Sequence, residues 1–365
     1  MPRADLPAPR RGATRRRAST VWAPRSASSA AREWVVRWWD HKGGGFGSLL
    51  HLLTLPLEIG FRGASGLRNR MYDSGAFPLQ RAPVPVISVG NLSVGGSGKT
   101  PFAAWLVRGL RAKGENPALI VHGYSEDELV LHRRWNPDCL VMAEQDRAYG
   151  AWKAARRGAT VVVLDDGFQH RRLARDLDLV LVPFDTPATM RLLPRGPFRE
   201  PLSALARADV VAITLKGSDR PAPDLEGRLA PFVEEPPMRV ALVPDCWTEL
   251  SGERAEAPDG DFLAICGIGD PDGFARTLRQ ATGRDGELLA FPDHHDYSWG
   301  DILEIESRVR GRTLVTTEKD AVKLEAFTGD LPEVLVLHLR VKVLQGEEAF
   351  WSRIQGILGS AGGRG

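Results

Sequence analysis

A glycine-rich stretch near residue 95 has the residue types that bind phosphate. Gly95-Gly96-Ser97-Gly98 is followed by Lys99 and Thr100, with an apolar, β-branched run before it and a helix-like stretch after it. This order is typical of a phosphate-binding P-loop, whose backbone N–H groups and positive helix end surround the phosphate oxygens. There Lys99 adds charge complementarity, and the Thr100 hydroxyl can bind Mg²⁺. The nucleotide site we predict comprises Ser93, Val94, Gly95, Gly96, Ser97, Gly98, Lys99 and Thr100.

The P-loop departs from its usual form at one position. Ser93 stands where the pattern G-x-x-x-x-G-K-[ST] has its first glycine. The alternative interpretation is a glycine-rich turn with a surface lysine. That alternative explains neither the preceding strand nor the following helix, so we favour the nucleotide site.

Two adjacent carboxylates end a second apolar run. Residues 160–164 read Thr-Val-Val-Val-Leu, and Asp165 and Asp166 follow directly. Parallel strands deliver their last residues to one edge of the sheet, so these acids should lie beside the P-loop, where one can hold Mg²⁺. We therefore predict a metal site with Thr100, Asp165 and Asp166. The alternative is that Asp166 only caps a helix.

Strand-like and helix-like runs alternate from residue 84 onward. The predicted strands are 84–89, 118–122, 160–164, 177–182, 209–213, 262–266, 287–291, 313–316 and 334–339. Helical stretches are expected between several of them, as at 101–113 and 147–157. Such alternation favours a parallel sheet with helices on both faces. The predicted fold class is α/β, with a P-loop NTPase-like, mostly parallel sheet domain, a second smaller α/β domain and an N-terminal membrane-contacting helix.

Composition sets the domain limits and excludes some classes of protein. The chain has 365 residues, 43% apolar and 26% charged, which is typical of a globular protein of about two domains. A Pro/Glu-rich patch at 234–237 suggests a P-loop domain over 76–235 and a C-terminal α/β domain over 236–358. Three widely spaced cysteines without a C-x-x-C argue against a zinc site or a disulfide framework, and suit a reducing cytosol.

The N-terminal region is basic and then apolar. Residues 1–32 hold eight Arg and one Asp, which predicts either a disordered solvated arm or a contact with an anionic surface. Residues 46–57 follow without a charge and are too few to span a bilayer, which needs roughly 20. Flanking Trp and Arg side chains favour an interfacial helical segment over 33–75. The alternative is an ordinary helix buried against the domain.

Five motifs in order resemble one enzyme family. Asp165-Asp166-Gly167-Phe168-Gln169-His170 resembles the D-D-G-[FL]-Q-H signature of the tetraacyldisaccharide 4′-kinases, the lipid A 4′-kinases. The P-loop is similar to that of the family, which has Ser or Thr at the deviant first position. Further segments that resemble family motifs are 193–201 (L-P-x-G-x-x-R-E-P), 291–294 (F-x-D-H) and 317–323 (T-E-K-D-A-V-K). The resemblance covers roughly residues 45–345.

The resemblance implies an activity, a location and partners. The family transfers the γ-phosphate of ATP, with Mg²⁺, to the 4′-hydroxyl of a tetraacylated glucosamine disaccharide 1-phosphate. It works at the cytoplasmic face of the bacterial inner membrane, so we expect a peripheral or monotopic protein there. The expected partners are the lipid disaccharide and the membrane surface, with no nucleic acid and no obligate protein partner. The implied fold is a P-loop domain with a smaller α/β domain that closes over the cleft.

The resemblance also implies the catalytic residues. In the family, an Asp of a G-D-E-P-like segment and the His of F-x-D-H form a dyad beside the attacking hydroxyl. The matching positions here are Asp127 and His294, which together with Lys99 are the predicted catalytic residues. The loop before Asp127 is shorter than in the family, and Glu126 replaces the preceding Gly, so Glu126 or Glu128 stays open as an alternative base. Glu200 is carried over as a metal-site residue, and Gln169, His170 and Arg199 as neighbours of the site.

Other classes of protein fit the sequence less well. A partitioning ATPase of the deviant-Walker type would have a lysine where Val94 stands, and a GTPase switch would have an N-K-x-D segment, which the chain lacks. A catalytically degenerate, membrane-bound nucleotide switch or scaffold remains the alternative function, because of the altered loop near Asp127.

Overall fold

The computed structural model describes residues 20–22, 34–35, 38–39, 44–123, 126–216 and 224–361. The strands are β1 Thr20–Trp22, β2 Val86–Asn91, β3 Pro117–Val121, β4 Leu140–Ala143, β5 Val161–Asp165, β6 Leu177–Pro183, β7 Val210–Lys216, β8 Met238–Glu249, β9 Arg254–Ala255, β10 Phe262–Cys266, β11 Glu287–Ala290, β12 Thr313–Thr317 and β13 Val334–Gln345. The α-helices are α2 Gly44–Leu53, α3 Leu55–Asp73, α4 Lys99–Ala112, α5 Glu126–Trp135, α6 Arg147–Arg156, α7 Leu225–Leu229, α8 Pro271–Thr282, α9 Trp299–Val309, α10 Glu318–Leu324 and α11 Glu347–Ala361.

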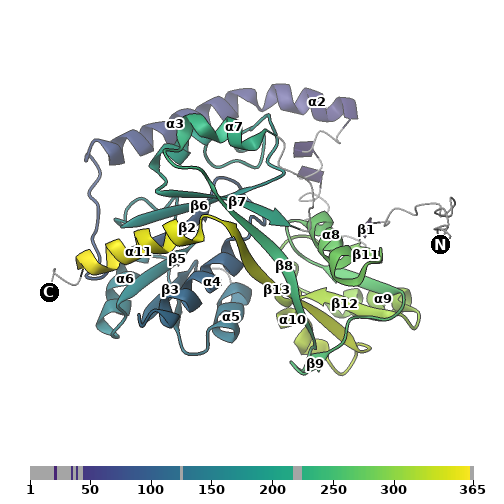
Figure 1. The fold of residues 1–365 in the computed structure, drawn as a ribbon. Coiled ribbons are helices and arrows are strands. Elements are labelled where there is room, and N and C mark those ends of the chain that lie inside the picture. Colours follow the sequence, from purple (N-terminus) through teal and green to yellow (C-terminus); the bar gives the residue numbers. More distant parts are fainter. Residues whose placement is uncertain are drawn as a thin grey trace, which may run out of the picture.

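Within the described residues, thirteen strands form one mixed sheet. Their order is β1-β11-β10-β12-β13-β8-β7-β6-β2-β5-β3-β4, with β9 paired to β8. The pairs are parallel except β13–β8 and β8–β9, which are antiparallel. Figure 1 shows the two halves of this sheet side by side, each with its own helices. The predicted α/β fold class, a P-loop-type parallel sheet with a second α/β unit, is confirmed.

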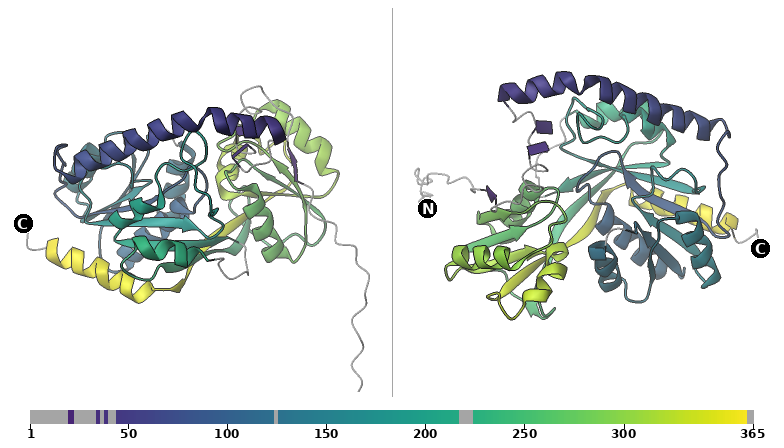
Figure 2. Two further views of the ribbon diagram at one scale, coloured as in Figure 1. Left: turned by 90° about the horizontal axis from the view of Figure 1, so that it is seen from above. Right: turned by 180° about the vertical axis from the view of Figure 1, so that it is seen from behind.

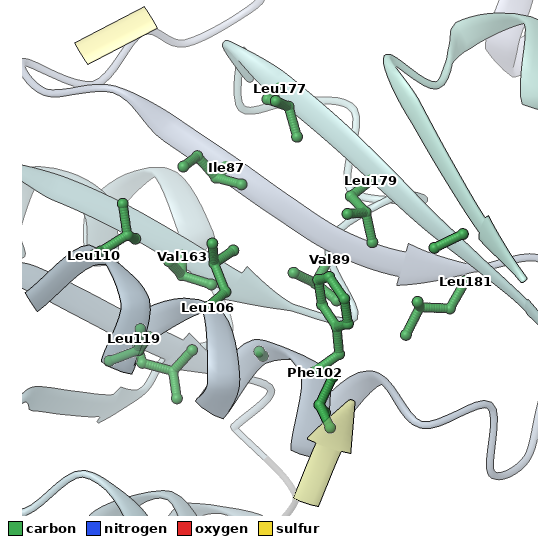
Figure 3. Packing of buried hydrophobic residues seen from close by; sticks show 14 of the residues in the cluster. Ile87, Val89, Phe102, Leu106, Leu110, Leu119, Val163, Leu177, Leu179 and Leu181 are labelled. Carbon is green, nitrogen blue, oxygen red and sulfur yellow. The ribbon is translucent and has the colours of Figure 1, made fainter. Parts of the chain in front are cut away.

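The core of the first half lies between β2 and its neighbours on one side and α4 on the other. All six residues of β2 and all five of β5 are buried, as the continuous apolar runs predicted. Phe102, Leu106 and Leu110 recur every four residues, so they share one face of α4 and pack on these strands (Figure 3). Full burial of each such side chain contributes about 1.5–3 kcal/mol, which fixes the helix directly after the P-loop.

Two long antiparallel strands join the halves. β8 and β13 have 12 residues each, and Leu335 opposes Glu249 while Gln345 opposes Arg239. The start of β8 pairs with β7, and the start of β13 pairs with β12. The sequence did not predict β8, because Pro244-Asp245 interrupts its apolar pattern in the manner of a turn.

The last helix returns to the first half. Phe350 and Ile354 of α11 are buried in the same core cluster as Phe102, and the Phe102 and Phe350 ring centroids lie 6.2 Å apart. Figure 1 shows α11, in yellow, alongside the first half. Residues 347–358, which the sequence assigned to the C-terminal domain, therefore pack against the P-loop domain.

The second half packs helices against β10, β11 and β12. Ile302, Ile305 and Val309 place one face of α9 in the core, while Phe274 and Leu278 of α8 belong to a second cluster. A capping box between Ser298 and Asp301 starts α9.

The N-terminal helices α2 and α3 lie along the outside of the sheet, as Figure 2 shows. Thr54 N donates to Leu50 O and Thr54 O accepts from Glu58 N, so the helical path continues between them. At the helical turn of 100° per residue, six exposed apolar side chains fall on one side of this continuous helix. They are Leu49, Leu52, Leu53, Leu57, Ile59 and Leu67. In the part of the chain that is described, no helix is long and apolar enough to cross a membrane.

One described segment lies within the predicted N-terminal arm. β1, Thr20–Trp22, pairs in parallel with β11, with Val21 opposite Leu289. These three residues depart from the disorder predicted for 1–32, because the edge of β11 offers them backbone hydrogen bonds. The rest of that arm lies outside the described residues.

Candidate active site

The loop between β2 and α4 has the backbone conformation that its glycines predicted. Gly95 and Gly98 have φ of 106° and 87°, in the left-handed region that favours glycine. Asn91 Nδ2 donates to Ser97 Oγ at 2.8 Å, and Val94 N donates to Pro197 O at 2.8 Å. The loop is thus held from within and from the 192–199 segment, while Lys99 opens α4.

Asp166 lies between two cations beside this loop. Its Oδ1 is 3.8 Å from Lys99 Nζ, and Arg199 Nη1 donates to both of its oxygens at 3.0 and 2.8 Å. Burial acts to raise the pKa of Asp166, but Lys99 and Arg199 outweigh it and hold that pKa below its ordinary value. The carboxylate is therefore charged at neutral pH and pairs with both cations, which leaves the group of three with one net positive charge.

Asp165 ends β5 and is almost fully buried. The guanidinium of Arg147 fixes the backbone here, because Nη1 donates to Ile120 O at 2.6 Å and Nη2 donates to Asp165 O at 3.1 Å. Among the described residues, Asp165 Oδ1 is buried and has no hydrogen-bond partner. An orphaned carboxylate oxygen fits a divalent cation, and Thr100 lines the same cavity. The residues present therefore fit Mg²⁺.

Asp127 and His294 meet across the two halves. His294 Nδ1 lies 3.2 Å from Asp127 Oδ2, although the two residues are far apart in the chain. Asp127 is in the first turn of α5 and is buried, whereas the His294 side chain is 42% exposed. His294 has φ of 59°, and its backbone N–H donates to Gly267 O at 3.1 Å, which fixes the backbone that carries the ring.

Two lysines of the second half add positive charge to this pair. Lys319 Nζ lies 3.8 Å and Lys323 Nζ lies 3.6 Å from Asp127 Oδ2. Burial acts to raise the pKa of Asp127, but His294, Lys319 and Lys323 hold it well below its ordinary range. The contact with Asp127 raises the pKa of His294 against burial and Lys319. The proton shared by the pair therefore resides on His294.

One cavity of about 490 Å³ connects these groups. The residues that line it come from both halves: Gly95, Gly96, Ser97, Gly98, Lys99, Thr100, Glu128, Asp165, Asp166 and Arg199 from the first, and Asp270, Phe274, Asp293, His294, Glu318 and Lys319 from the second. Apolar side chains, among them Leu131, Trp135 and Leu337, line it as well. The cavity thus combines a phosphate-binding loop, cations and His294, behind which Asp127 lies.

Comparison with known proteins identifies the family. The model of the tetraacyldisaccharide-1-P 4′-kinase family matches residues 50–128 and 126–359. The tetraacyldisaccharide 4′-kinase of Anaeromyxobacter sp. (strain K) is 36% identical over 89% of this chain and 95% of its own length. The chain belongs to the tetraacyldisaccharide 4′-kinase family.

Relatives and a solved structure agree with this membership. The enzyme of the same name from Chlorobaculum parvum is 34% identical over 80% of this chain and 91% of its own length. This chain is also similar to LpxK from Aquifex aeolicus, whose crystal structure in complex with ATP is known. The two sequences are 30% identical, and the structures match with a TM-score of 0.68 over 85% of this chain and 99% of that one.

Not every site residue predicted from the family motifs lies in the cavity. Glu200 is buried, and its oxygens accept from Asn69 at 2.8 Å and bind Arg207 at 2.9 Å. Gln169 Nε2 donates to Asn91 O at 2.8 Å and supports the strand before the loop. Burial and then Arg147 lower the pKa of His170 to about 4, so this ring is neutral. These three residues, with Ser93, Val94 and the predicted base Asp127, are outside the cavity lining. Asp127 lies next to the cavity through its contact with His294, which does line it.

Three lysines at the site were not assigned a role from the sequence. Lys319 and Lys323 belong to the quoted T-E-K-D-A-V-K motif, which supplied a signal for them. Lys216, at the end of β7, contacts the Gly96 carbonyl and lies 3.2 Å from Asp270. No motif marks Lys216, because only the sheet order brings the end of β7 to the P-loop.

Proposed function

We propose that this protein transfers the γ-phosphate of ATP to the 4′-hydroxyl of a tetraacyldisaccharide 1-phosphate. The observation that carries the proposal is the 3.2 Å contact of Asp127 with His294, whose side chain lines the cavity that also contains the P-loop. The family membership supplies the substrate class. The cavity thus offers a phosphate site, and the Asp127–His294 pair beside it offers a base, the two things that phosphoryl transfer to an alcohol needs.

The phosphate end of the site acts by charge and position. The backbone N–H groups from Gly95 to Thr100, together with the ammonium of Lys99, bind the β- and γ-phosphate oxygens. Thr100 and Asp165 would hold Mg²⁺, and when bound this ion neutralises charge that develops on the phosphates. Asp166 keeps Lys99 and Arg199 in place through its contacts at 3.8 Å and 2.8 Å.

The base end of the site accepts the proton. The oxygen of the 4′-hydroxyl forms a bond to the γ-phosphorus, the bond from that phosphorus to the bridging oxygen breaks, and ADP leaves. The hydroxyl proton passes to the carboxylate of Asp127, which its cationic neighbours keep ionised. His294 holds this carboxylate, and Lys319 lies between His294 and Glu128, at 3.0 Å and 3.9 Å.

The degenerate scaffold is the less favoured function. It would follow if the altered loop had displaced the base, yet Asp127 lies 3.2 Å from His294, which lines the cavity. Glu128 remains the alternative base, since it lines the cavity and burial, followed by Asp165, raises its pKa. Glu126 is exposed and outside the lining.

The lipid substrate calls for a surface that meets the membrane. The apolar stripe of α2 and α3, defined by Leu49, Leu52, Leu53, Leu57, Ile59 and Leu67, supplies it. Glu58 lies on the opposite side of α3 and is buried, where it accepts from Leu192 N at 2.9 Å and Arg195 at 3.0 Å. We place this stripe in the cytoplasmic leaflet of the inner membrane, as a monotopic contact.

The deciding experiment is transfer of labelled γ-phosphate from ATP to a tetraacyldisaccharide 1-phosphate in detergent. Wild type should transfer, Asp127→Asn should lose about 100-fold or more in kcat, and Glu126→Gln should behave as wild type. Loss in Glu128→Gln but not in Asp127→Asn moves the base to Glu128. Wild type that binds ATP without transfer would favour the scaffold.

A further inference from the structure

A buried histidine touches the predicted metal-site aspartate. His132, on α5, has no solvent exposure, and its Nε2 lies 3.0 Å from Asp165 Oδ2. Its ring packs edge-on against Trp135, with centroids 5.8 Å apart. A buried polar ring costs free energy unless its hydrogen bonds are made. Nδ1 of this ring has no partner among the described residues, so the contact of Nε2 with Asp165 is the one that offsets the cost.

The chemistry of the pair fixes which atom donates. An ionised carboxylate only accepts, so His132 Nε2 carries the hydrogen and donates it to Asp165 Oδ2. The second oxygen, Asp165 Oδ1, has no partner among the described residues. One oxygen is therefore oriented by protein, and the other stays available for a ligand.

The neighbouring acid is not available in the same way. Both oxygens of Asp166 accept from Arg199, and Lys99 lies 3.8 Å from one of them. Asp165, which lines the cavity, is thus the acid that has an oxygen without a hydrogen-bond partner among the described residues. We propose that His132 is a positioning residue that orients Asp165 toward the divalent cation of the nucleotide, an inference that rests on the proposed function.

The helix that carries His132 is itself fixed by the second half. Arg134 Nη2 donates to Glu325 Oε2 at 2.6 Å, and Trp135 Nε1 donates to Glu318 Oε1 at 2.6 Å. Asp127 stands at the start of the same helix. α5 therefore joins the base to the cation ligand, and a change at His132 should act on the cation more than on the nucleotide.

The test measures cation affinity in the full-length protein. His132→Leu removes the donor, whereas His132→Gln keeps an N–H group near the position of Nε2. Mn²⁺ affinity for the enzyme–ADP complex is read from the free-Mn²⁺ electron paramagnetic resonance signal, and ATP affinity is measured with and without Mg²⁺. Removing a residue that orients a metal ligand typically lowers metal affinity about 10–100-fold, and we expect a loss of that size in Mn²⁺ affinity for His132→Leu. His132→Gln should restore Mn²⁺ affinity to within about threefold of wild type. The affinity for ATP without metal should stay unchanged in both variants.

A matched histidine supplies the control. His295 Nε2 also lies 3.0 Å from an aspartate, Asp301 Oδ2, but neither residue lines the cavity. His295→Leu should leave Mn²⁺ affinity unchanged. Melting temperatures identify unfolded variants, and if His132→Leu unfolds, His132→Asn, whose amide is too short to reach Asp165, replaces it.

Two results overturn the inference. The first is that folded His132→Leu, or His132→Asn in its place, binds Mn²⁺ as tightly as wild type does. The second is that folded His132→Gln loses as much Mn²⁺ affinity as the variant without the donor. The proposed function fails separately: wild type would then show no tightening of ATP by Mg²⁺ and no transfer to the lipid acceptor, whatever residue stands at 132.

Discussion

Replacing Asp127 by Asn should reverse the direction of the pKa shift of His294. In the wild type, the contact with Asp127 is the largest influence on His294 and raises its pKa, while burial and Lys319 lower it. The amide introduced by Asp127→Asn would keep the shape of the side chain and remove its charge. Burial and Lys319, which both lower the pKa, are then opposed by Asp293 alone among the named neighbours, and each acts more strongly than Asp293, so the pKa of His294 should fall below its ordinary value of 6.5.

The size of the effect follows from the geometry. Unit charges at 3.2 Å attract by about 1 kcal/mol at the dielectric constant of water and about 5 kcal/mol at an effective value of about 20. The His294 side chain is 42% exposed, so solvent screening favours the lower end, about 1 kcal/mol. The loss in kcat should be larger, about 10²–10⁴-fold or about 2.7–5.4 kcal/mol, because the substitution removes the proposed general base itself.

The assay is a titration of His294 by histidine-selective NMR, together with stability against pH. A raised folded pKa means that His294 stabilises the wild type fully below about pH 6.5, and that this stability is lost as pH rises through the folded pKa. In Asp127→Asn the folded pKa of His294 lies below its unfolded value, so the effect of this histidine on stability has the opposite sign. Acidification below about pH 6.5 should therefore destabilise the variant relative to wild type. Glu126→Gln, one residue away on the exposed side of α5, should leave the titration unchanged. A His294 pKa that stays above its ordinary value of 6.5 in Asp127→Asn would refute the assigned pair.

Three further predictions follow from other parts of the molecule. The double variant Leu52→Glu, Leu57→Glu changes side chains that are 65% and 60% exposed, so its melting temperature should stay unchanged. Its binding to anionic lipid vesicles in a sedimentation assay should weaken about tenfold or more. Binding equal to that of wild type would exclude the apolar stripe as a membrane contact. Phe350→Ala should cost about 3–5 kcal/mol of unfolding free energy in urea, since this ring is 2% exposed against Phe102; a cost under about 1 kcal/mol would contradict the docking of α11. Arg199→Lys should lower kcat about tenfold or more, because an ammonium holds Asp166 less rigidly than the guanidinium; unchanged kinetics would argue against its role.

Local patterns predicted the parts of the fold that local physics decides. The buried strands β2 and β5 are continuous apolar runs, and the glycines of the loop mark left-handed backbone at positions 95 and 98. The strand β8 was not predicted, because Pro244 within it resembles a turn signal. Pairing with β7 and β13 holds this segment extended in spite of Pro244. Non-local pairing overrides a turn signal, which no window of sequence can show.

The site residues likewise include some that local sequence patterns predict and some that only the folded chain brings together. The P-loop and Asp165-Asp166 could be placed from spacing alone, since strand ends share one edge of a parallel sheet. The pairing of Asp127 with His294 required the family resemblance, because nothing in either segment encodes the other. His132 lacked any signal: within α5 it is one polar residue among several, and only the end of β5 beside it gives the ring a partner.

One segment connects α3 to the P-loop. Leu192 N and Arg195 bind Glu58 of α3, while Pro197 O accepts from Val94 N in the P-loop and Arg199 binds Asp166. The segment 192–199 therefore fixes α3 relative to the loop through buried, charged contacts, which are costly to break singly. With the leucine stripe placed on the membrane, as proposed, these contacts set the height of the P-loop above the lipid surface. Glu58→Gln should then lower transfer to a membrane-embedded acceptor more than transfer to a detergent-dispersed one, and equal losses in both would show that Glu58 only stabilises the fold.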